Sequence, residues 1–234
     1  MPVKQSDRNS TNYIAHRRES DGAIQCLESH LCAVGKLTRR FAAKIKVDQV
    51  DCNAAIDLSV VGEVLGLLHD FGKYSKEFQD YLKSAVGLID WDEDDFVNAL
   101  HLRGRIDHST AGAQFIWKAL AASGPHGVLP AQVMALCIAS HHSGLIDCLA
   151  PDGEDIFSRR IRKLEASAHL EEAMRNADSA ILHRLATMID GGEIANNFHK
   201  VICALMAVEN RAGDCGRSAP LSQEQSLSSA THRS

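Results

Sequence analysis

The chain has 234 residues, which is enough for one domain with a substantial core. Apolar residues make up 45% and charged residues 24%, and no apolar run approaches the roughly 20 residues that a membrane span needs. The formal net charge of −5 argues against tight binding of nucleic acid through a basic surface, although bound metal ions could supply local positive charge. With no secretory signal pattern and no C-x-x-C pair among seven cysteines, we expect reduced thiols in a cytoplasmic protein.

Helical periodicity dominates the first half of the chain. Apolar residues recur at steps of three and four over residues 24–45, which predicts a first long helix. A second helix is predicted over residues 54–70, with Gly72 as its C-cap glycine. Ser75 is the predicted N-cap of a short third helix that reaches Leu82.

The second half of the chain continues in the same pattern after an acidic stretch, residues 90–95, that is predicted to be a solvated loop. A helix is predicted to begin near Asp107 and to be broken by Gly124-Pro125. The next should hold Pro130 in its first turn and end at Gly144. Three further helices are predicted over residues 154–175, 179–188 and 193–212.

The fold class predicted from these elements is all-α, a compact helical bundle in a single domain. No alternating strand pattern reaches a useful length. Residues 1–22 are assigned to an N-terminal extension and residues 23–212 to the domain. Residues 213–234 are rich in serine and nearly lack large apolar side chains, which predicts a disordered tail.

Histidine is the most informative residue type, because twelve is a high number for this length and imidazole is the commonest protein metal ligand. His69 and Asp70 are adjacent at the end of a predicted helix, His108 opens another, and His141-His142 closes a third. A bundle can bring such helix ends together at one mouth. A carboxylate beside an imidazole at a helix end could then bridge two cations.

Each of these features has an ordinary explanation when it is taken alone. A single histidine within a long amphipathic helix, such as His30, is more often a surface or core residue than a ligand. The combination of all four features, with Lys73 three residues after Asp70, is much harder to obtain by chance. The histidines interpreted as solvent-exposed or packing residues are His16, His101, His126, His169, His183, His199 and His232.

A longer motif begins at the His-Asp pair. Residues 69–82 read H-D-x-G-K-x-x-x-x-F-Q-x-Y-L, which closely resembles the HD-domain nuclease of CRISPR type I interference systems, a branch of the HD phosphohydrolases. That domain is the nuclease module of the CRISPR-associated helicase-nuclease, and is sometimes encoded as a separate chain. The order of the other histidines agrees: an early His30, then His108 in H-S-x-x-G/A, then H-H-x-G at residues 141–144. The resemblance covers roughly residues 25–212.

The resemblance implies an HD-type helical domain with two adjacent divalent transition metals that cleaves single-stranded DNA. Partners would be a helicase domain or subunit and the guide-RNA surveillance complex that exposes the DNA. Imidazole-rich ligation suits Mn, Fe, Co, Ni or Zn, and Mg is possible on a bridging carboxylate. The implied roles are Asp70 as bridge, His30 and His69 on one ion, His108, His141 and His142 on the other, and Lys73 beside the scissile phosphate.

One position departs from the family pattern. The family usually closes the first metal site with an Asp in a helix that ends A-D-R or A-D-W, whereas residues 205–214 here read LMAVENRAGD. Glu209 is the nearest carboxylate by register, with Asn210 and Asp214 close by. A Glu can ligate but reaches about one bond further, so the first metal could be weak, displaced or absent. An ordinary surface role for Glu209 is equally compatible with the pattern.

Two other functions stay open on the sequence. An HD phosphohydrolase that acts on a nucleotide or small phosphate ester would share the metal core and would suit the acidic net charge better. A non-catalytic adaptor would result if the site had decayed at Glu209. A Walker-type ATPase is not supported, because Tyr74 follows Gly72-Lys73 where that motif needs Ser or Thr.

Overall fold

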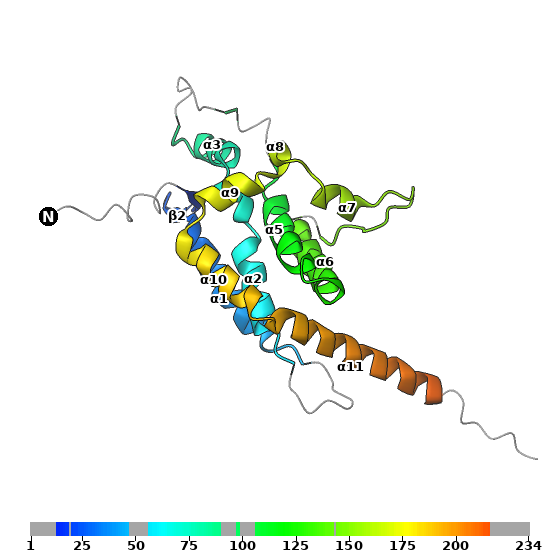
Figure 1. Ribbon diagram of the computed structural model, residues 1–234. Coiled ribbons are helices and arrows are strands. Elements are labelled where there is room, and N and C mark those ends of the chain that lie inside the picture. The colour runs from blue at the N-terminus through cyan, green and yellow to red at the C-terminus, as the bar shows by residue number, and fades with distance from the viewer. Residues whose placement is uncertain are drawn as a thin grey trace, which may run out of the picture.

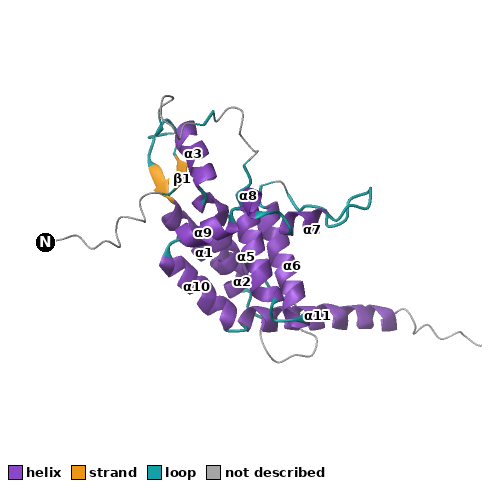
Figure 2. Cartoon of the chain, turned by 45° about the horizontal axis from the view of Figure 1, so that its top comes forward, coloured by secondary structure: helices purple, strands orange, loops and turns teal. Residues whose placement is uncertain are grey.

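The computed structural model describes residues 13–18, 20–46, 56–89, 97–98, 106–142 and 144–215, with residues 205–215 described by their backbone alone. Within these residues the chain forms α-helices and one 3-10 helix joined by loops, with one short two-stranded sheet (Figures 1 and 2). The predicted all-α class is therefore confirmed. None of the described helices is long and apolar enough to cross a bilayer.

The first helix pair consists of α1 (Leu27–Ala42) and α2 (Ser59–Leu68), which lie along each other. The prediction that α1 begins at residue 24 is wrong by three residues. Residues Ile24–Cys26 form strand β2, which pairs antiparallel with β1 (Ile14–Arg17). The helix begins where this pairing ends, and the Leu27 N–H donates to the carbonyl of Tyr13 at 2.9 Å.

The chain turns sharply after α2, through a 3-10 helix η2 (Phe71–Tyr74), into α3 (Lys76–Ala85). Ser75 caps α3 as predicted, and its Oγ accepts from the Phe78 N–H. Gly72 is not a C-cap glycine, because it lies inside η2. Its N–H donates to the carbonyl oxygen of His108 at 3.0 Å, and a Cβ at this position would lie only 2.3 Å from that oxygen.

The second helix pair consists of α5 (Ser109–Ala121) and α6 (Pro125–Ser140). α6 begins earlier than predicted, because Gly124 turns the chain at φ +77° and Pro125 fits the first helical position. Pro130 is therefore inside the helix. α6 also ends at Ser140, before Gly144, because the chain folds back there and the Ile146 N–H donates to Ser140 Oγ.

Five further helices follow α6 in the part of the chain that the structure describes. The single helix predicted over 154–175 is instead three short ones, partly because His169 adopts a left-handed conformation at φ +55° between the second and third. These five helices are α7 (Ile156–Ile161), α8 (Glu165–Ala168), α9 (Leu170–Asn176), α10 (Ser179–Asp190) and α11 (Glu193–Cys215).

Two predicted segments, the acidic loop at 90–95 and residues 216–234 of the tail, lie outside the described residues.

The core between the helix pairs brings the end of α2 against the beginning of α5. A Cβ at Gly112 on α5 would lie 2.0 Å from the carbonyl oxygen of Leu68, the last residue of α2. Side chains from both pairs, including Leu68, Phe71, Ile116 and Ile138, are essentially without exposed surface in this core. Because α2 and α5 approach so closely, the residues that follow α2 lie beside the residues that precede α5.

We expect Gly72→Ala to lower the free energy of unfolding by about 1–3 kcal/mol, because the methyl group would collide with backbone rather than with a flexible side chain. Gly191→Ala is the matched control, since its φ is −65° and the nearest atom to an added Cβ is 3.5 Å away. Chemical denaturation of the two variants beside the wild type measures the difference. Equal stability of the two variants would contradict the close approach of Gly72 to His108.

Candidate metal centre

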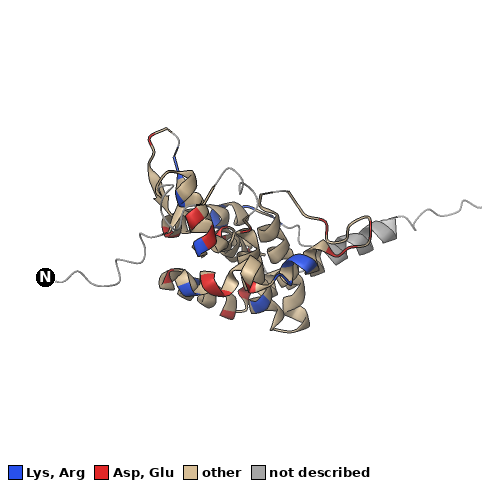
Figure 3. Ribbon diagram, turned by 90° about the horizontal axis from the view of Figure 1, so that it is seen from above, with Lys and Arg blue, Asp and Glu red and all other residues tan. Residues whose placement is uncertain are grey.

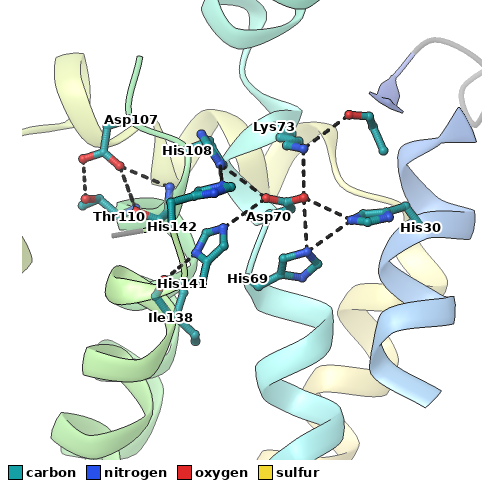
Figure 4. A network of polar contacts seen from close by, with 12 residues as sticks. His30, His69, Asp70, Lys73, Asp107, His108, Thr110, Ile138, His141 and His142 are labelled. Atoms are coloured by element: carbon teal, nitrogen blue, oxygen red, sulfur yellow. Dashed lines mark hydrogen bonds and ion pairs between the residues drawn. The ribbon is translucent and has the colours of Figure 1, made fainter. Parts of the chain in front are cut away.

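Three helix ends and one first turn meet around Asp70 (Figure 4). His69 is the C-cap residue of α2 and His108 the N-cap residue of α5, while His141 is the C-cap residue of α6. His30 lies in the first turn of α1. The helix-end positions predicted from the sequence are thus confirmed.

The two oxygens of the Asp70 carboxylate face different groups of imidazoles. Oδ2 lies 3.1 Å from His30 Nε2 and 3.2 Å from His69 Nε2. Oδ1 lies 3.4 Å from Nε2 of both His108 and His141. Asp70 is only 2% exposed, so its carboxylate contacts imidazoles on both sides in place of water. The carboxylate is thus placed between two groups of imidazoles.

The tautomers of two imidazoles follow from their backbone contacts. His69 Nδ1 lies 2.8 Å from the Gly66 carbonyl oxygen, and His141 Nδ1 lies 2.7 Å from that of Ile138. A carbonyl oxygen only accepts, so each Nδ1 carries the proton and donates it. Nε2 of each ring points at the Asp70 carboxylate, where it is a donor if it carries a proton and is otherwise a lone pair available to a cation. Such backbone hydrogen bonds are the usual way in which a metal-binding histidine is held.

His142 extends the group on the Oδ1 side. Its Nε2 lies 2.6 Å from Nε2 of His108, and its ring is 4.0 Å from that of His141 between centroids. Burial, and then the neighbouring His141 and His108, lower the pKa of His142 to about 4. The ring is therefore neutral at physiological pH, which is the form that can bind a metal ion.

The charge of Asp70 is stabilised in the folded protein. Burial alone would raise its pKa, but the surrounding imidazoles, with His108 and His141 foremost, outweigh this effect and hold the pKa far below the usual range. Lys73 adds an ion pair, with its Nζ 2.9 Å from Oδ2 and its side chain 5% exposed. The same ammonium donates to the carbonyl of Ala15 at 3.3 Å.

The spacing of these atoms fits divalent cations. Adjacent ligands that share one ion at bond lengths of about 2.0–2.2 Å lie about 3.0–3.5 Å apart, and the separations of the imidazole nitrogens from Asp70 lie at 3.1–3.4 Å. Two of these atoms, Asp70 Oδ1 and His141 Nε2, are also buried without a hydrogen-bond partner. If neither atom carries a proton, their close approach is unfavourable unless a cation lies between them. Asp70 with His108, His141 and His142 forms one group with metal-binding spacing.

Comparison with known families agrees with this geometry. The family described as "Cas3, HD domain" matches residues 16–208. The chain belongs to the Cas3 HD-domain family. A comparison with curated proteins and another with solved structures each gave no match. The family resemblance drawn from the HD-x-G-K block is confirmed, and the chain is a metal-dependent hydrolase of this family.

Asp107, predicted only to lie near the start of a helix, is a positioning residue of this HD domain. Its carboxylate accepts from the backbone N–H groups of Ser109 and Thr110 at the start of α5. It also pairs with Lys163 at 2.5 Å and with Arg160 at 3.3 Å, which joins the beginning of α5 to the end of α7. The adjacent His108 is thereby fixed at the metal centre. The position of Asp107 two residues before the Ser109-Thr110 pair that opens α5 is the signal that could have indicated this role.

His16 is exposed and packs against His30, as predicted for a solvent-exposed or packing histidine, but it also lies beside the site of this Cas3 HD domain. Its ring is 4.7 Å from that of His30 between centroids, and it belongs to a second group with metal-binding spacing, together with His30 and Asp70. Burial, and then Lys73 and His30, lower the pKa of His16 to about 4. The side chain of Glu209, like His101, lies outside the described part, so its predicted role stays a prediction.

We expect Asp107→Asn to lower the free energy of unfolding by about 1–3 kcal/mol at pH 7, because it removes the charged partner of Lys163 and Arg160. Burial alone would raise the pKa of Asp107, but Lys163 and Thr110 outweigh it and depress the pKa below its usual range. A depressed carboxyl pKa stabilises the fold above the unfolded pKa of about 4, and this contribution is lost as the pH falls below that value.

The stability difference between wild type and Asp107→Asn should therefore shrink between pH 7 and pH 3. Thermal unfolding in the presence of chelator measures it, with Asp190→Asn, an exposed carboxylate at the end of α10, as control. A difference that stays constant over this range would mean that the Asp107 charge does not hold the start of α5.

Proposed function

We propose that this domain is a metal-dependent nuclease that hydrolyses phosphodiester bonds of single-stranded DNA in CRISPR interference. We further propose that its site is dinuclear, with Asp70 bridging the two ions. The observation that carries the proposal is that each oxygen of the buried Asp70 carboxylate faces its own pair of imidazoles. A single ion would need only one of these groups.

The proposed ligands divide along the Asp70 carboxylate. His30 and His69 would hold the ion at Oδ2, and Glu209 is a candidate to join them. The ion at Oδ1 would be held by His108, His141 and His142. Imidazole-rich ligation favours Mn, Fe, Co, Ni or Zn, and Mg is possible on the bridging carboxylate. When bound, such a pair of ions lowers the pKa of a water and offsets negative charge on the phosphate oxygens.

The chain's own residues prepare this chemistry before any substrate arrives. The backbone carbonyls of Gly66 and Ile138 hold the protons of His69 and His141 on Nδ1, so both Nε2 lone pairs are available without rearrangement. Lys73 has three N–H donors, and Asp70 and Ala15 account for two of them. We assign the third to a phosphate oxygen, where a fixed positive charge stabilises charge that develops during hydrolysis.

The charge distribution supports a substrate that is delivered rather than captured from solution. Positive and negative segments are interspersed over the described helices (Figure 3), and the net charge is −5. Such a surface gives little sequence-independent attraction for a polyanion. We therefore propose that a helicase domain or subunit and the CRISPR surveillance complex present the DNA strand to this domain, and that the metal centre supplies the local positive charge.

Asp70→Asn should abolish cleavage of circular single-stranded DNA and reduce bound metal from two ions to one or none, because the amide cannot bridge two cations. The assay uses metal-stripped protein supplied in turn with Mn, Ni, Co, Fe or Mg. Since Asp70→Asn leaves the Lys73 ammonium buried beside a neutral amide, Asp70→Asn/Lys73→Met serves as a second variant without an unpaired charge. Circular dichroism checks that both remain folded.

Normal cleavage by a folded Asp70 variant would refute the site assignment. If the wild type binds metal but cuts no DNA with any ion, the activity belongs to a smaller phosphate ester, and nucleotides are the next substrates to test. If it binds no metal, the catalytic proposal itself is wrong.

Lys73→Met should lower the turnover number by about 10²-fold or more, the usual effect of removing one charge-stabilising donor, while the protein keeps both ions. Methionine retains the apolar stem of lysine but removes the ammonium, including its contact with the Phe78 ring. Single-turnover cleavage and elemental analysis of the same sample separate the two effects. A loss of metal in parallel with the loss of rate would show that Lys73 orders Asp70 instead of acting on the phosphate.

A further inference from the structure

Strand β1 is fixed against the metal centre by two buried side chains from the HD-x-G-K block and α3. Gln79 holds Ile14 from both sides, accepting from its N–H at 2.9 Å and donating Nε2–H to its carbonyl at 3.0 Å. Lys73 Nζ, which pairs with Asp70, donates to the carbonyl of Ala15 at 3.3 Å. Ile14 and Ala15 are 6% and 0% exposed. The next residue, His16, is thus attached to a rigid backbone that the site itself holds.

An irregularity in the hairpin determines the direction of His16. Ile14 pairs with Cys26 and His16 pairs with Gln25, so Ala15 is an extra residue on its strand and the register shifts between Ile14 and His16. A bulge of this kind turns the following side chain away from regular alternation, and bulges commonly occur beside active sites for this reason. It also leaves the Ala15 carbonyl available to Lys73.

His16 is exposed, and its imidazole lies beside His30, which faces Oδ2 of Asp70. Its ring crosses that of His30 nearly at right angles, at 78° and 4.7 Å between centroids. One ligand atom of His16, one of His30 and one of Asp70 all lie within 4.8 Å of one another. Two ligands on opposite sides of one ion are about 4.2 Å apart at ordinary bond lengths. A small side-chain adjustment would therefore let one ion contact all three.

The ion at Oδ2 also has fewer described ligands than its neighbour. Among the described side chains, Oδ1 is faced by the group of three histidines at 108, 141 and 142, whereas Oδ2 has His30 and His69 as imidazole neighbours. Transition metals in proteins commonly take at least four ligands. Asp70 Oδ2, His30 and His69 make three described donors, and a ligand from β1 would supply a fourth.

We propose that His16 is a ligand of the cation at the Oδ2 side of Asp70, together with His30 and His69. The proposal rests on the dinuclear site described above. It makes the N-terminal hairpin part of the metal centre. The opposing interpretation is that His16 only packs its ring against His30 at the edge of the site, in which case removing it would leave metal affinity and coordination unchanged.

Cobalt binding tests the proposal without reference to activity. Metal-free wild type and His16→Ala are titrated with Co²⁺, and binding is followed by equilibrium dialysis and by the visible absorption of the bound ion, which reports coordination number and ligand type. We expect His16→Ala to weaken one of the two ions by about 10-fold or more, since loss of even an outer partner of a ligand commonly costs that much. The spectrum of that ion should change as well.

Three further variants make the result specific. His183→Ala removes an exposed histidine on α10 and should bind both ions as the wild type does. His16→Asp supplies another ligating group and should recover part of the affinity that alanine loses. In a His142→Ala background, which weakens the Oδ1 ion, His16→Ala should remove most of the remaining cobalt. Thermal unfolding in chelator checks that His16→Ala is folded.

Two results would overturn the proposal, and they are distinguishable. If the wild type binds two cobalt ions and His16→Ala binds them with the same affinities and spectrum, His16 is not a ligand and the dinuclear site stands. If the wild type binds no cobalt on the Oδ2 side, both the dinuclear site and the role of His16 are wrong.

Discussion

A buried carboxylate surrounded by imidazole nitrogens is the constraint on which the rest of this structure depends. Asp70 is almost fully removed from water, and at least two of the rings around it hold a proton on Nδ1, so their Nε2 atoms can present lone pairs to a cation. Such a group of acceptors is costly to bury without positive charge. Lys73 supplies one charge on the Oδ2 side, and bound cations would supply the rest. The geometry is thus that of a site prepared for metal ions.

The fold can be understood as the means of assembling this group. Most of the imidazoles come from helix ends. The backbone beside a helix end is not bound to helical geometry, so it can direct neighbouring side chains to one point. Glycines permit the required closeness, with Gly72 against His108 and Gly112 against the end of α2. Asp107 then anchors the start of α5, and Lys73 joins the carboxylate to β1. Because the chain belongs to the Cas3 HD-domain family, we interpret these contacts as the support of a site for metal-dependent hydrolysis.

Local signals in the sequence predicted the helices and the helix-end histidines, because periodicity, caps and the HD-x-G-K block each depend on a few neighbouring residues. Features that depend on distant contacts were missed. Gly72 was interpreted as a cap because its role, an approach to His108, depends on the packing of α5. The break at His169 was missed, whereas the start of α6 was misplaced although its signal, Gly124 followed by Pro125, is local. His16 carried no local signal, since only the pairing of a short bulged strand brings it to His30.

The central claim is that Asp70 bridges two cations, and a crystal of the protein soaked in Mn²⁺ tests it most directly. The account predicts two anomalous-scattering peaks, one beside each oxygen of Asp70, with His30 and His69 at one peak and His108, His141 and His142 at the other. A single peak, or two peaks that do not share the Asp70 carboxylate, would contradict the account.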